Sequence, residues 1–168
     1  MSRYKMRIVI VSVISCCILF LVLGSAQDTA SSKESITKDI IARYRFFEGP
    51  SAEQTWEKWQ SYFLNSPNIG NMHGDQLEIG WEVYQKESEN YYKRPVAQKA
   101  GIRFDDLNIF VVDEKTAWVT GTFVNTTGEK EIQPVFYDML TKTPEGWRVF
   151  FSYVAPPEQV QKNREDGH

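Results

Sequence analysis

The sequence predicts one α+β domain, in which helices come first and strands follow. Two observations support this prediction. Before Pro95, apolar residues recur at the three- and four-residue spacing of helices, whereas from Arg103 onward short alternating runs are separated by turn residues. Helices followed by strands are the order of an α+β domain, and strands joined by such short links favour an antiparallel meander.

The N-terminal residues 1–26 have the order of a secretory signal peptide. Three basic side chains within the first seven residues precede an apolar run over residues 8–23, and Gly24 and Ala26 place small residues at both positions that a signal peptidase reads. Cleavage there leaves Gln27 as the new N-terminus, so we expect a secreted or periplasmic protein. The alternative is a retained membrane anchor, because the run of about 16 apolar residues is only slightly shorter than the ~20 that span a bilayer.

Composition narrows the range of partners. Both cysteines, Cys16 and Cys17, lie inside the signal segment, so the mature chain would have no disulfide and no cysteine metal ligand. Loss of that segment takes the formal charge from −3 to −6 and leaves no cluster of Lys and Arg, which argues against nucleic acid as a partner. Contact with a membrane is expected only through an uncleaved signal segment.

Three helices are expected after a polar linker, residues 27–33. The first begins at the capping-box pattern Ser31-x-x-Glu34 and ends before Gly49-Pro50, the second begins at Ser51-x-x-Gln54, and the third begins at Gly80. The apolar stripes of these helices are, in order, Ile36, Ile40, Ile41, Tyr44 and Phe47; Trp56, Trp59 and Phe63; and Trp81, Tyr84, Tyr91 and Tyr92.

Four long strands are expected after the helices. They cover residues 103–112, 116–124, 131–141 and 147–155, and a short hairpin is expected in the Gly- and Asn-rich segment 68–79. In the last strand Trp147, Val149, Phe151 and Tyr153 occupy alternate positions, so we expect them on one face. The polar tail, residues 158–168, lies outside the predicted domain, residues 34–157.

Three segments carry a family resemblance. They are Gly80-Trp81-Glu82-Val83-Tyr84 at the start of the third helix, Thr116-Ala117-Trp118-Val119-Thr120-Gly121 in the second long strand, and residues 142–157 in the final hairpin. In this order and spacing they resemble the nuclear transport factor 2-like superfamily, with its SnoaL-like and ketosteroid isomerase-like branches, over roughly residues 36–157. The resemblance implies a cone-shaped curved antiparallel sheet packed against about three N-terminal helices. It also implies a homodimer, because relatives often pair through the outer face of the sheet.

The resemblance further implies that one face of the strands lines a cavity for a small apolar ligand. Six residues are the candidate pocket residues: Trp56, Trp59, Trp118, Thr120, Phe151 and Tyr153. In many relatives the last strand reads Trp-x-hydrophobic-x-His-x-His-x-Ser, and here Phe151 and Tyr153 stand where the two histidines would be. This strand is therefore expected to line or fill the cavity and not to move protons.

Three residues are candidates for acid–base chemistry. Asp75 lies in the region where isomerase-type relatives place a general base, although a solvated hairpin tip is the favoured explanation. Tyr44 would donate a hydrogen bond to a developing oxyanion, or pack in the core, which is favoured. Asp138 lies within a strand, where it either faces the pocket or pairs with Arg148 across the final hairpin. The ion pair is favoured because a lone buried charge is costly.

Other chemistries find little support in the sequence. The two histidines, His73 and His168, are not spaced as metal ligands, and we expect neither a metal nor a cofactor. Two functions from different classes remain. The favoured function is an exported, non-enzymatic domain that binds a small apolar ligand or a protein partner. The alternative is a small isomerase, lyase or hydrolase that uses Tyr44, Asp75 and Asp138.

Overall fold

The computed structural model describes residues 32–155. The predicted signal peptide, the first part of the linker and the polar tail lie outside these described residues. The chain divides into two compact units, residues 1–36 and 37–168, and the sheet and the cavity belong to the second. Within residues 32–155, no helix is both long enough and apolar enough to cross a bilayer.

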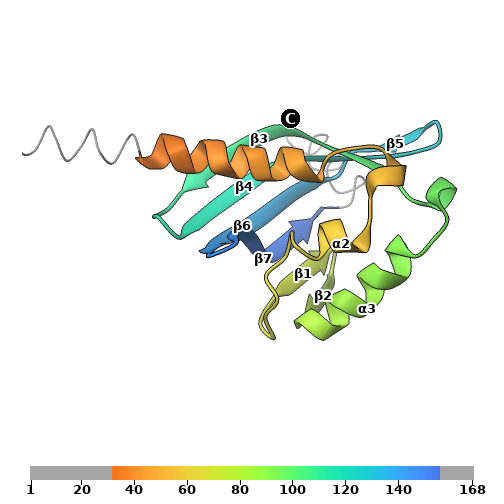
Figure 1. Ribbon diagram of the computed structural model, residues 1–168, viewed down its shortest axis with the longest axis horizontal. Coiled ribbons are helices and arrows are strands. Elements are labelled where there is room, and N and C mark those ends of the chain that lie inside the picture. Colours follow the sequence, from red (N-terminus) through yellow and green to blue (C-terminus); the bar gives the residue numbers. More distant parts are fainter. Residues whose placement is uncertain (1–31, 156–168) are drawn as a thin grey trace, which may run out of the picture. The chain divides into compact units, whose positions relative to one another are not determined.

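All the helical elements precede the four long strands of the sheet, as the sequence predicts (Figure 1). Residues 32–47 are helical. The further helical elements are the 3-10 helix η1 (Ser51–Glu53), α2 (Trp56–Trp59), α3 (Trp81–Tyr92) and the 3-10 helix η2 (Val96–Gln98). In the first helix Ile40, Tyr44 and Phe47 are completely buried, so the predicted apolar stripe does face the core.

The second helix is shorter than the sequence predicts. The apolar stripe indicates one helix that continues as far as Phe63, but the chain forms η1, two extended residues and the single turn of α2. The break occurs at Gln54, whose fully buried side chain accepts the Trp59 indole N–H at 2.7 Å. Thr55 then caps α2, because its hydroxyl oxygen accepts the Lys58 backbone N–H at 3.2 Å.

Seven strands form one mixed, open sheet. They are β1 (Gly70–His73), β2 (Gln76–Ile79), β3 (Gly101–Val111), β4 (Thr116–Thr127), β5 (Lys130–Ile132), β6 (Val135–Thr143) and β7 (Gly146–Val154). Their order in the sheet is β2-β1-β7-β6-β4-β3, with β5 paired to β4. The α+β class and the antiparallel meander of β3, β4, β6 and β7 are therefore confirmed.

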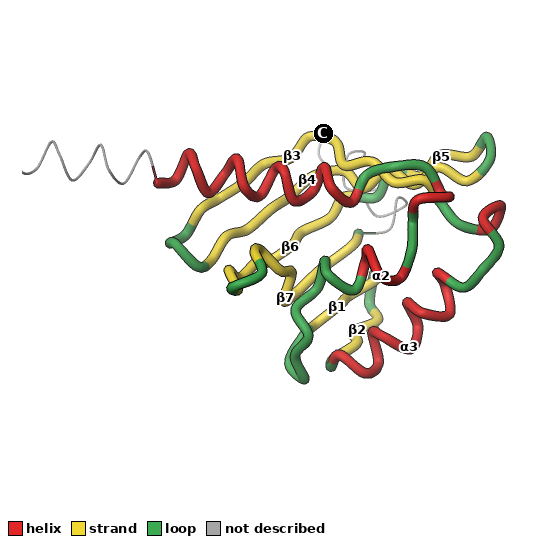
Figure 2. Tube along the Cα trace, in the orientation of Figure 1, coloured by secondary structure: helices red, strands yellow, loops and turns green. Residues whose placement is uncertain are grey.

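The sheet is not antiparallel throughout, which corrects the expectation from the sequence. The predicted hairpin forms as β1 and β2, and it lies beside the last strand, so that β1 runs parallel to β7 (Figure 2). In this register Gly70 is opposite Phe151. A Cβ at position 70 would lie 2.6 Å from the Phe151 ring, so only glycine allows this close approach.

One face of the sheet packs against the first helix through aromatic rings. Tyr44 lies with its ring centroid 5.0 Å from that of Phe104 on β3 and 5.7 Å from that of Phe136 on β6. The ring centroids of Phe47 and Tyr62 are 4.8 Å apart. We call this helix-covered side the inner face, and the opposite side the outer face. The inner face therefore carries the aromatic core and positions the side chains of the candidate site.

A bulge in β7 changes which side chains face inward. Leu140 pairs with Val149 but Met139 pairs with Phe151, so Phe150 is an extra residue on β7. Val149 faces inward before the bulge, whereas Phe151 faces outward after it. The prediction that all alternate residues of this strand share one face is therefore wrong, because a single inserted residue reverses the alternation.

Candidate functional site

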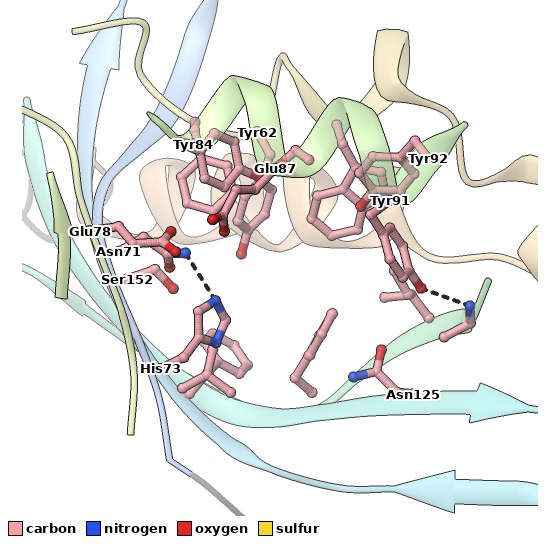
Figure 3. Close-up of a pocket in the computed structure, with 18 of the residues that line it drawn as sticks. Tyr62, Asn71, His73, Glu78, Tyr84, Glu87, Tyr91, Tyr92, Asn125 and Ser152 are labelled. Atoms are coloured by element: carbon pink, nitrogen blue, oxygen red, sulfur yellow. Dashed lines mark hydrogen bonds between the residues drawn. The ribbon is translucent and has the colours of Figure 1, made fainter. Parts of the chain in front are cut away.

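A cavity of about 740 Å³ opens between the inner face of the sheet, helix α3 and the segment around Tyr62 (Figure 3). Aromatic rings supply most of its walls, among them Trp59, Tyr84, Tyr92, Phe104 and Phe123. Such a volume and such walls are typical of sites for small organic molecules. The polar side chains in the cavity fall into a deep group around Asp138 and a second group at the mouth.

The deep group centres on the Asp138 carboxyl group, which is 2% exposed. Its Oδ2 atom accepts the Tyr44 hydroxyl at 2.7 Å and the Tyr62 hydroxyl at 2.5 Å. Its Oδ1 atom is buried and has no hydrogen-bond partner of normal geometry among the described residues. Ser152, directly opposite in the β6–β7 register, acts on the pKa of Asp138 without satisfying Oδ1.

Burial controls the protonation of the deep group. It raises the pKa of Asp138, and the hydrogen bonds from Tyr62 and Tyr44, together with the nearby Ser152 side chain, act in the opposite direction without cancelling it. Burial, and then the nearby Asp138 carboxyl group, raises the pKa of both tyrosines well above the ordinary value. In the neutral acid Oδ2 remains the acceptor for two hydroxyls, so the proton belongs on Oδ1. There it makes no hydrogen bond of normal geometry among residues 32–155, although the Ser152 hydroxyl lies on the neighbouring strand.

The mouth of the cavity carries Asn71, His73, Glu78 and Glu87. The Asn71 amide nitrogen lies 2.9 Å from His73 Nε2, which therefore accepts while Nδ1 holds the proton. Burial lowers the pKa of His73, and Glu87 acts in the opposite direction. Burial, and then the neighbouring Glu87 carboxyl group, raises the pKa of Glu78.

A row of polar residues connects the two groups along the inner face. Asn71 on β1 is the register partner of Glu78 on β2 and of Ser152 on β7, and Ser152 is the partner of Asp138 on β6. The row continues into β4 at Val119, which is apolar and completely buried. Four neighbouring strands thus place polar side chains in line between the mouth and the aromatic interior.

Comparisons with solved structures identify this arrangement of helices and sheet. An NTF-2 like protein of unknown function from Shewanella oneidensis MR-1 matches at 13% identity, with a TM-score of 0.63, over 71% of this chain and 98% of that chain. A candidate dehydratase of the NTF2-like family from Streptomyces avermitilis matches at 15% identity and a TM-score of 0.58, over 73% and 97%. The chain has the nuclear transport factor 2-like fold.

A further neighbour with the same fold is a candidate scytalone dehydratase from Novosphingobium aromaticivorans. It matches at 11% identity and a TM-score of 0.56, over 74% of this chain and 86% of that chain. No protein-family sequence model matches the chain, and no curated protein sequence matches it. The resemblance inferred from three short segments is confirmed for the fold, and at these identities the likeness concerns the fold alone.

Within the nuclear transport factor 2-like fold, two of the three acid–base candidates come together. Tyr44 and Asp138 share a hydrogen bond, whereas Asp75 lies exposed in the turn between β1 and β2 and does not line the cavity. The predicted ion pair between Asp138 and Arg148 is wrong. Asp138 bonds to two tyrosines, and Arg148 pairs in register with Thr141, further along the hairpin.

The predicted pocket residues are divided between three places. Trp59 lines the cavity. Trp56 does not line it and instead stacks on Trp81, with ring centroids 5.9 Å apart. The other four lie on the outer face: Trp118, Thr120, Phe151 and Tyr153. For Phe151 and Tyr153 the cause is the β7 bulge. Tyr153 stacks there on Tyr137, with ring centroids 6.0 Å apart.

Sequence analysis missed Tyr62, Asn71 and Ser152. Tyr62 lies off the predicted helical stripe, and it reaches Asp138 only because α2 ends early. Asn71 looked like a turn residue in a Gly- and Asn-rich segment, and the parallel pairing with β7 that brings it inward has no local signal. Ser152 faces the cavity because of the bulge. The side chain of Asp138, flanked by apolar residues in a strand, was the one signal that pointed to this group.

Metal binding finds no support in the described part of the chain. Residues 32–155 contain no group of three or more His, Cys, Asp or Glu side chains arranged to hold a metal ion. The groups that the cavity does offer are a buried acid, hydroxyls, an amide, a histidine and carboxylates at the mouth. These can bind organic molecules by hydrogen bonds and can exchange protons with them.

Proposed function

We propose that the cavity binds a small, flat, mostly apolar molecule that carries a hydrogen-bond acceptor, such as a ketone oxygen, next to Asp138. The observation that carries this proposal is Asp138, which lines the cavity and whose buried Oδ1 atom has no hydrogen bond of normal geometry among the described residues. Leaving a buried polar atom unpaired costs about 1–3 kcal/mol. A bound acceptor would remove that cost, and the aromatic walls would hold the rest of the ligand.

A matched pair of probes tests this proposal. 2-Acetylnaphthalene carries one ketone oxygen, and 2-ethylnaphthalene has nearly the same shape without it. In equilibrium dialysis at pH 6 we expect the ketone to bind about 2- to 12-fold more tightly, the worth of one neutral hydrogen bond. If neither probe binds, the proposed ligand site is wrong.

Variants show whether Asp138 is responsible for the preference for the ketone. Asp138→Leu removes the hydrogen-bonding group at similar volume and should abolish the preference, whereas Asp138→Asn keeps an N–H donor and should retain part of it. Asp75→Asn makes the same change in charge outside the cavity and should leave binding unchanged. An unaltered preference in Asp138→Leu would show that the ketone is recognised elsewhere.

A second candidate function is proton transfer at a carbon next to the carbonyl group. The specific observation in its favour is His73, whose pKa is lowered by burial, so that it is neutral near pH 7; its Nε2 accepts the Asn71 amide N–H and would take a substrate proton once that hydrogen bond opens. In this reaction His73 would take the proton, the C–H electron pair would become the C=C bond, and the carbonyl electron pair would move onto the oxygen, so that the hydrogen bond from Asp138 stabilises the resulting enolate.

Isotope exchange distinguishes catalysis from binding alone. In D₂O, catalysis would replace the methyl hydrogens of 2-acetylnaphthalene by deuterium, seen as a loss of the methyl signal in proton NMR. His73→Gln should stop this exchange while leaving affinity for the ketone unchanged. Binding without any exchange above the buffer rate would support the ligand-binding function and exclude enolisation of this ketone.

A further inference from the structure

We infer that the mouth of the cavity holds an ammonium group of the ligand, between Glu78 and Glu87. This inference rests on the proposed function, since it concerns the outer end of the same ligand. It adds a charged group to the recognised molecule, so the ligand class becomes an amine with an apolar body.

The first argument is the position of the two carboxyl groups. Glu78 comes from β2 and Glu87 from α3, and both line the cavity. Figure 3 shows the two side chains converging beside Asn71, from opposite walls. Burial, and then Glu87, raises the pKa of Glu78, and a cation placed between the two side chains would offset the repulsion that Glu87 adds. An ammonium group also offers three N–H donors, which suit two carboxylates and the Asn71 side-chain oxygen.

The second argument is the charge around the mouth. Among the described residues that line the cavity, the cationic or titratable bases are Arg94 and His73. Arg94 follows the end of α3, seven residues beyond Glu87 and therefore on the order of 10 Å along the helix. Its guanidinium group lies over the Tyr91 ring, 5.3 Å from the centroid. Neither it nor the neutral His73 supplies a counter-ion between the two glutamates.

The third argument is independent of the glutamates and points to a ligand in the same cavity. Asp138 is 2% exposed, faces the cavity, and leaves Oδ1 without a partner among the described residues. The polar row Glu78, Asn71, Ser152, Asp138 spans three gaps between strands, about 14 Å at the usual strand spacing. One elongated molecule can therefore occupy both ends.

The wall between the two ends suits the body of such a molecule. The rings of Tyr84 and Tyr92, both from α3, line the cavity with Phe104 and Phe123 of the sheet. Aromatic faces attract alkyl and aryl groups and also stabilise a nearby cation. The Arg94–Tyr91 contact shows that a tyrosine ring of this helix already makes a cation–π interaction.

A matched pair of probes tests the inference. 4-Phenylbutylamine is an ammonium ion at pH 7, and 4-phenylbutan-1-ol has the same length and shape without the charge. In equilibrium dialysis of the full chain at about 0.05 M salt, we expect the amine to bind about 1.4- to 5-fold more tightly, the range for an exposed ion pair. Equal affinity for the two probes would overturn the inference.

Three variants show whether the mouth is responsible. Glu87→Gln and Glu78→Gln should each abolish most of the preference for the amine. Glu82→Gln changes the same charge at an exposed position of α3 outside the cavity and should leave the preference intact. An equal loss in Glu82→Gln would mean that only the net charge of the protein matters, which would also overturn the inference.

The inference and the proposed function can fail separately. If 2-acetylnaphthalene binds but the amine has no advantage over the alcohol, the ammonium site is wrong and the apolar site stands. If none of the four probes binds, the proposed function itself is wrong.

Discussion

Asp138 occupies the centre of the inner face, and its proton has consequences for stability as well as for binding. Burial raises its pKa above the ordinary value of 3.8. At pH values between 3.8 and the higher pKa of Asp138 in the folded state, the folded protein binds more protons than the unfolded chain does. The free energy of unfolding should therefore fall as the pH rises through this window, by about 1.4 kcal/mol for each unit of the shift.

Asp138→Asn tests this pH dependence because an amide cannot ionise. Its side-chain oxygen still accepts hydrogen bonds from Tyr44 and Tyr62. We expect the melting temperature of the variant, relative to the unmodified protein, to increase steadily above about pH 4. Differential scanning calorimetry at several pH values measures this difference. A constant difference from pH 3 to pH 8 would show that Asp138 titrates normally in the folded protein.

At the scale of single residues, the sequence indicated which side chains were unusual but not what they touch. Asp138 could be singled out because a strand rarely holds a charge between apolar neighbours, and Tyr44 because the family resemblance implies a hydrogen-bonding tyrosine. Their contact joins residues 94 positions apart, and Tyr62 joins the same oxygen from a third segment. Such contacts depend on tertiary packing, so spacing alone could not assign them, and the ion pair with Arg148 was the favoured interpretation.

At the scale of elements, the β7 bulge decides which hydroxyls can affect the ligand. Tyr153 lies on the outer face, so Tyr153→Phe should change the affinity for 2-acetylnaphthalene by less than about twofold. Tyr62→Phe makes the same chemical change inside the cavity and should weaken binding by about 2- to 10-fold, because the Tyr62 hydroxyl holds Asp138 in place. Equilibrium dialysis compares the two variants. A larger effect at Tyr153 would contradict the observed bulge.

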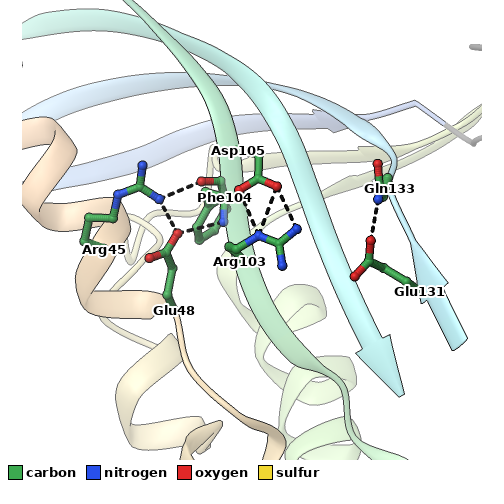
Figure 4. Close-up of polar contacts among 7 residues, drawn as sticks. All are labelled: Arg45, Glu48, Arg103, Phe104, Asp105, Glu131 and Gln133. Atoms are coloured by element: carbon green, nitrogen blue, oxygen red, sulfur yellow. Dashed lines mark hydrogen bonds and ion pairs between the residues drawn. The ribbon is translucent and has the colours of Figure 1, made fainter. Parts of the chain in front are cut away.

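The end of the first helix is tied to β3 by one side chain (Figure 4). Glu48 Oε1 accepts the Phe104 backbone N–H at 2.8 Å and pairs with Arg45, which in turn donates to the Phe104 carbonyl oxygen at 2.6 Å. These contacts fix the helix that carries Tyr44 against the strand beside it.

Loss of this tie should cost stability. Glu48→Ala leaves the Phe104 N–H without its partner, so we expect the free energy of unfolding to fall by about 1–3 kcal/mol. Urea denaturation measures it. Glu129→Ala, in the exposed turn between β4 and β5, is the matched control and should change it by less than about 0.5 kcal/mol. Equal effects of the two changes would argue against a role for Glu48 in holding the helix.

At the scale of the whole molecule, the order of helices and strands followed from periodicity and turn residues. The parallel pairing of β1 with β7 did not, because residues 70–73 and 151–154 are distant in sequence and neither segment indicates the other. The cavity could be expected only through family resemblance. Its polar row depends on register across four strands, which local patterns do not determine.

We expect the protein to act outside the cytoplasm after loss of residues 1–26. This prediction rests on the basic, apolar and small-residue order of the N-terminus. N-terminal sequencing of protein from its native host should give Gln27 as the first residue. Material that begins at Met1 or Ser2 would contradict the prediction.

We also expect a homodimer formed through the outer face of the sheet. An apolar row crosses that face over six strands: Phe110, Trp118, Met139, Phe151, Gly70 and Ile79. Phe110 is 61% exposed and Ile79 60%, which is unfavourable in water unless another surface covers them. The nearby Val112 is also exposed, whereas Val119 and Phe123 face inward and do not contribute to this row.

Light scattering tests the oligomeric state. The unmodified protein should have twice the mass of one chain, and Trp118→Glu, in the middle of the apolar row, should give a monomer. Val83→Glu makes a similar change at an exposed position of α3 and should leave the dimer intact. A monomer at high micromolar concentration without any substitution would contradict the expectation.

The parallel pairing of β1 with β7 also determines when this chain can finish folding. A ribosome or an export channel releases the protein from its N-terminus, so the β1–β2 hairpin emerges long before the strand that it must join. The wall of the cavity that holds Asn71 cannot close until residues 151–154 are free. Contacts between such distant segments form slowly. A chain that has to be threaded through a membrane while unfolded would gain from this delay, since its topology postpones the compact state until passage is almost complete.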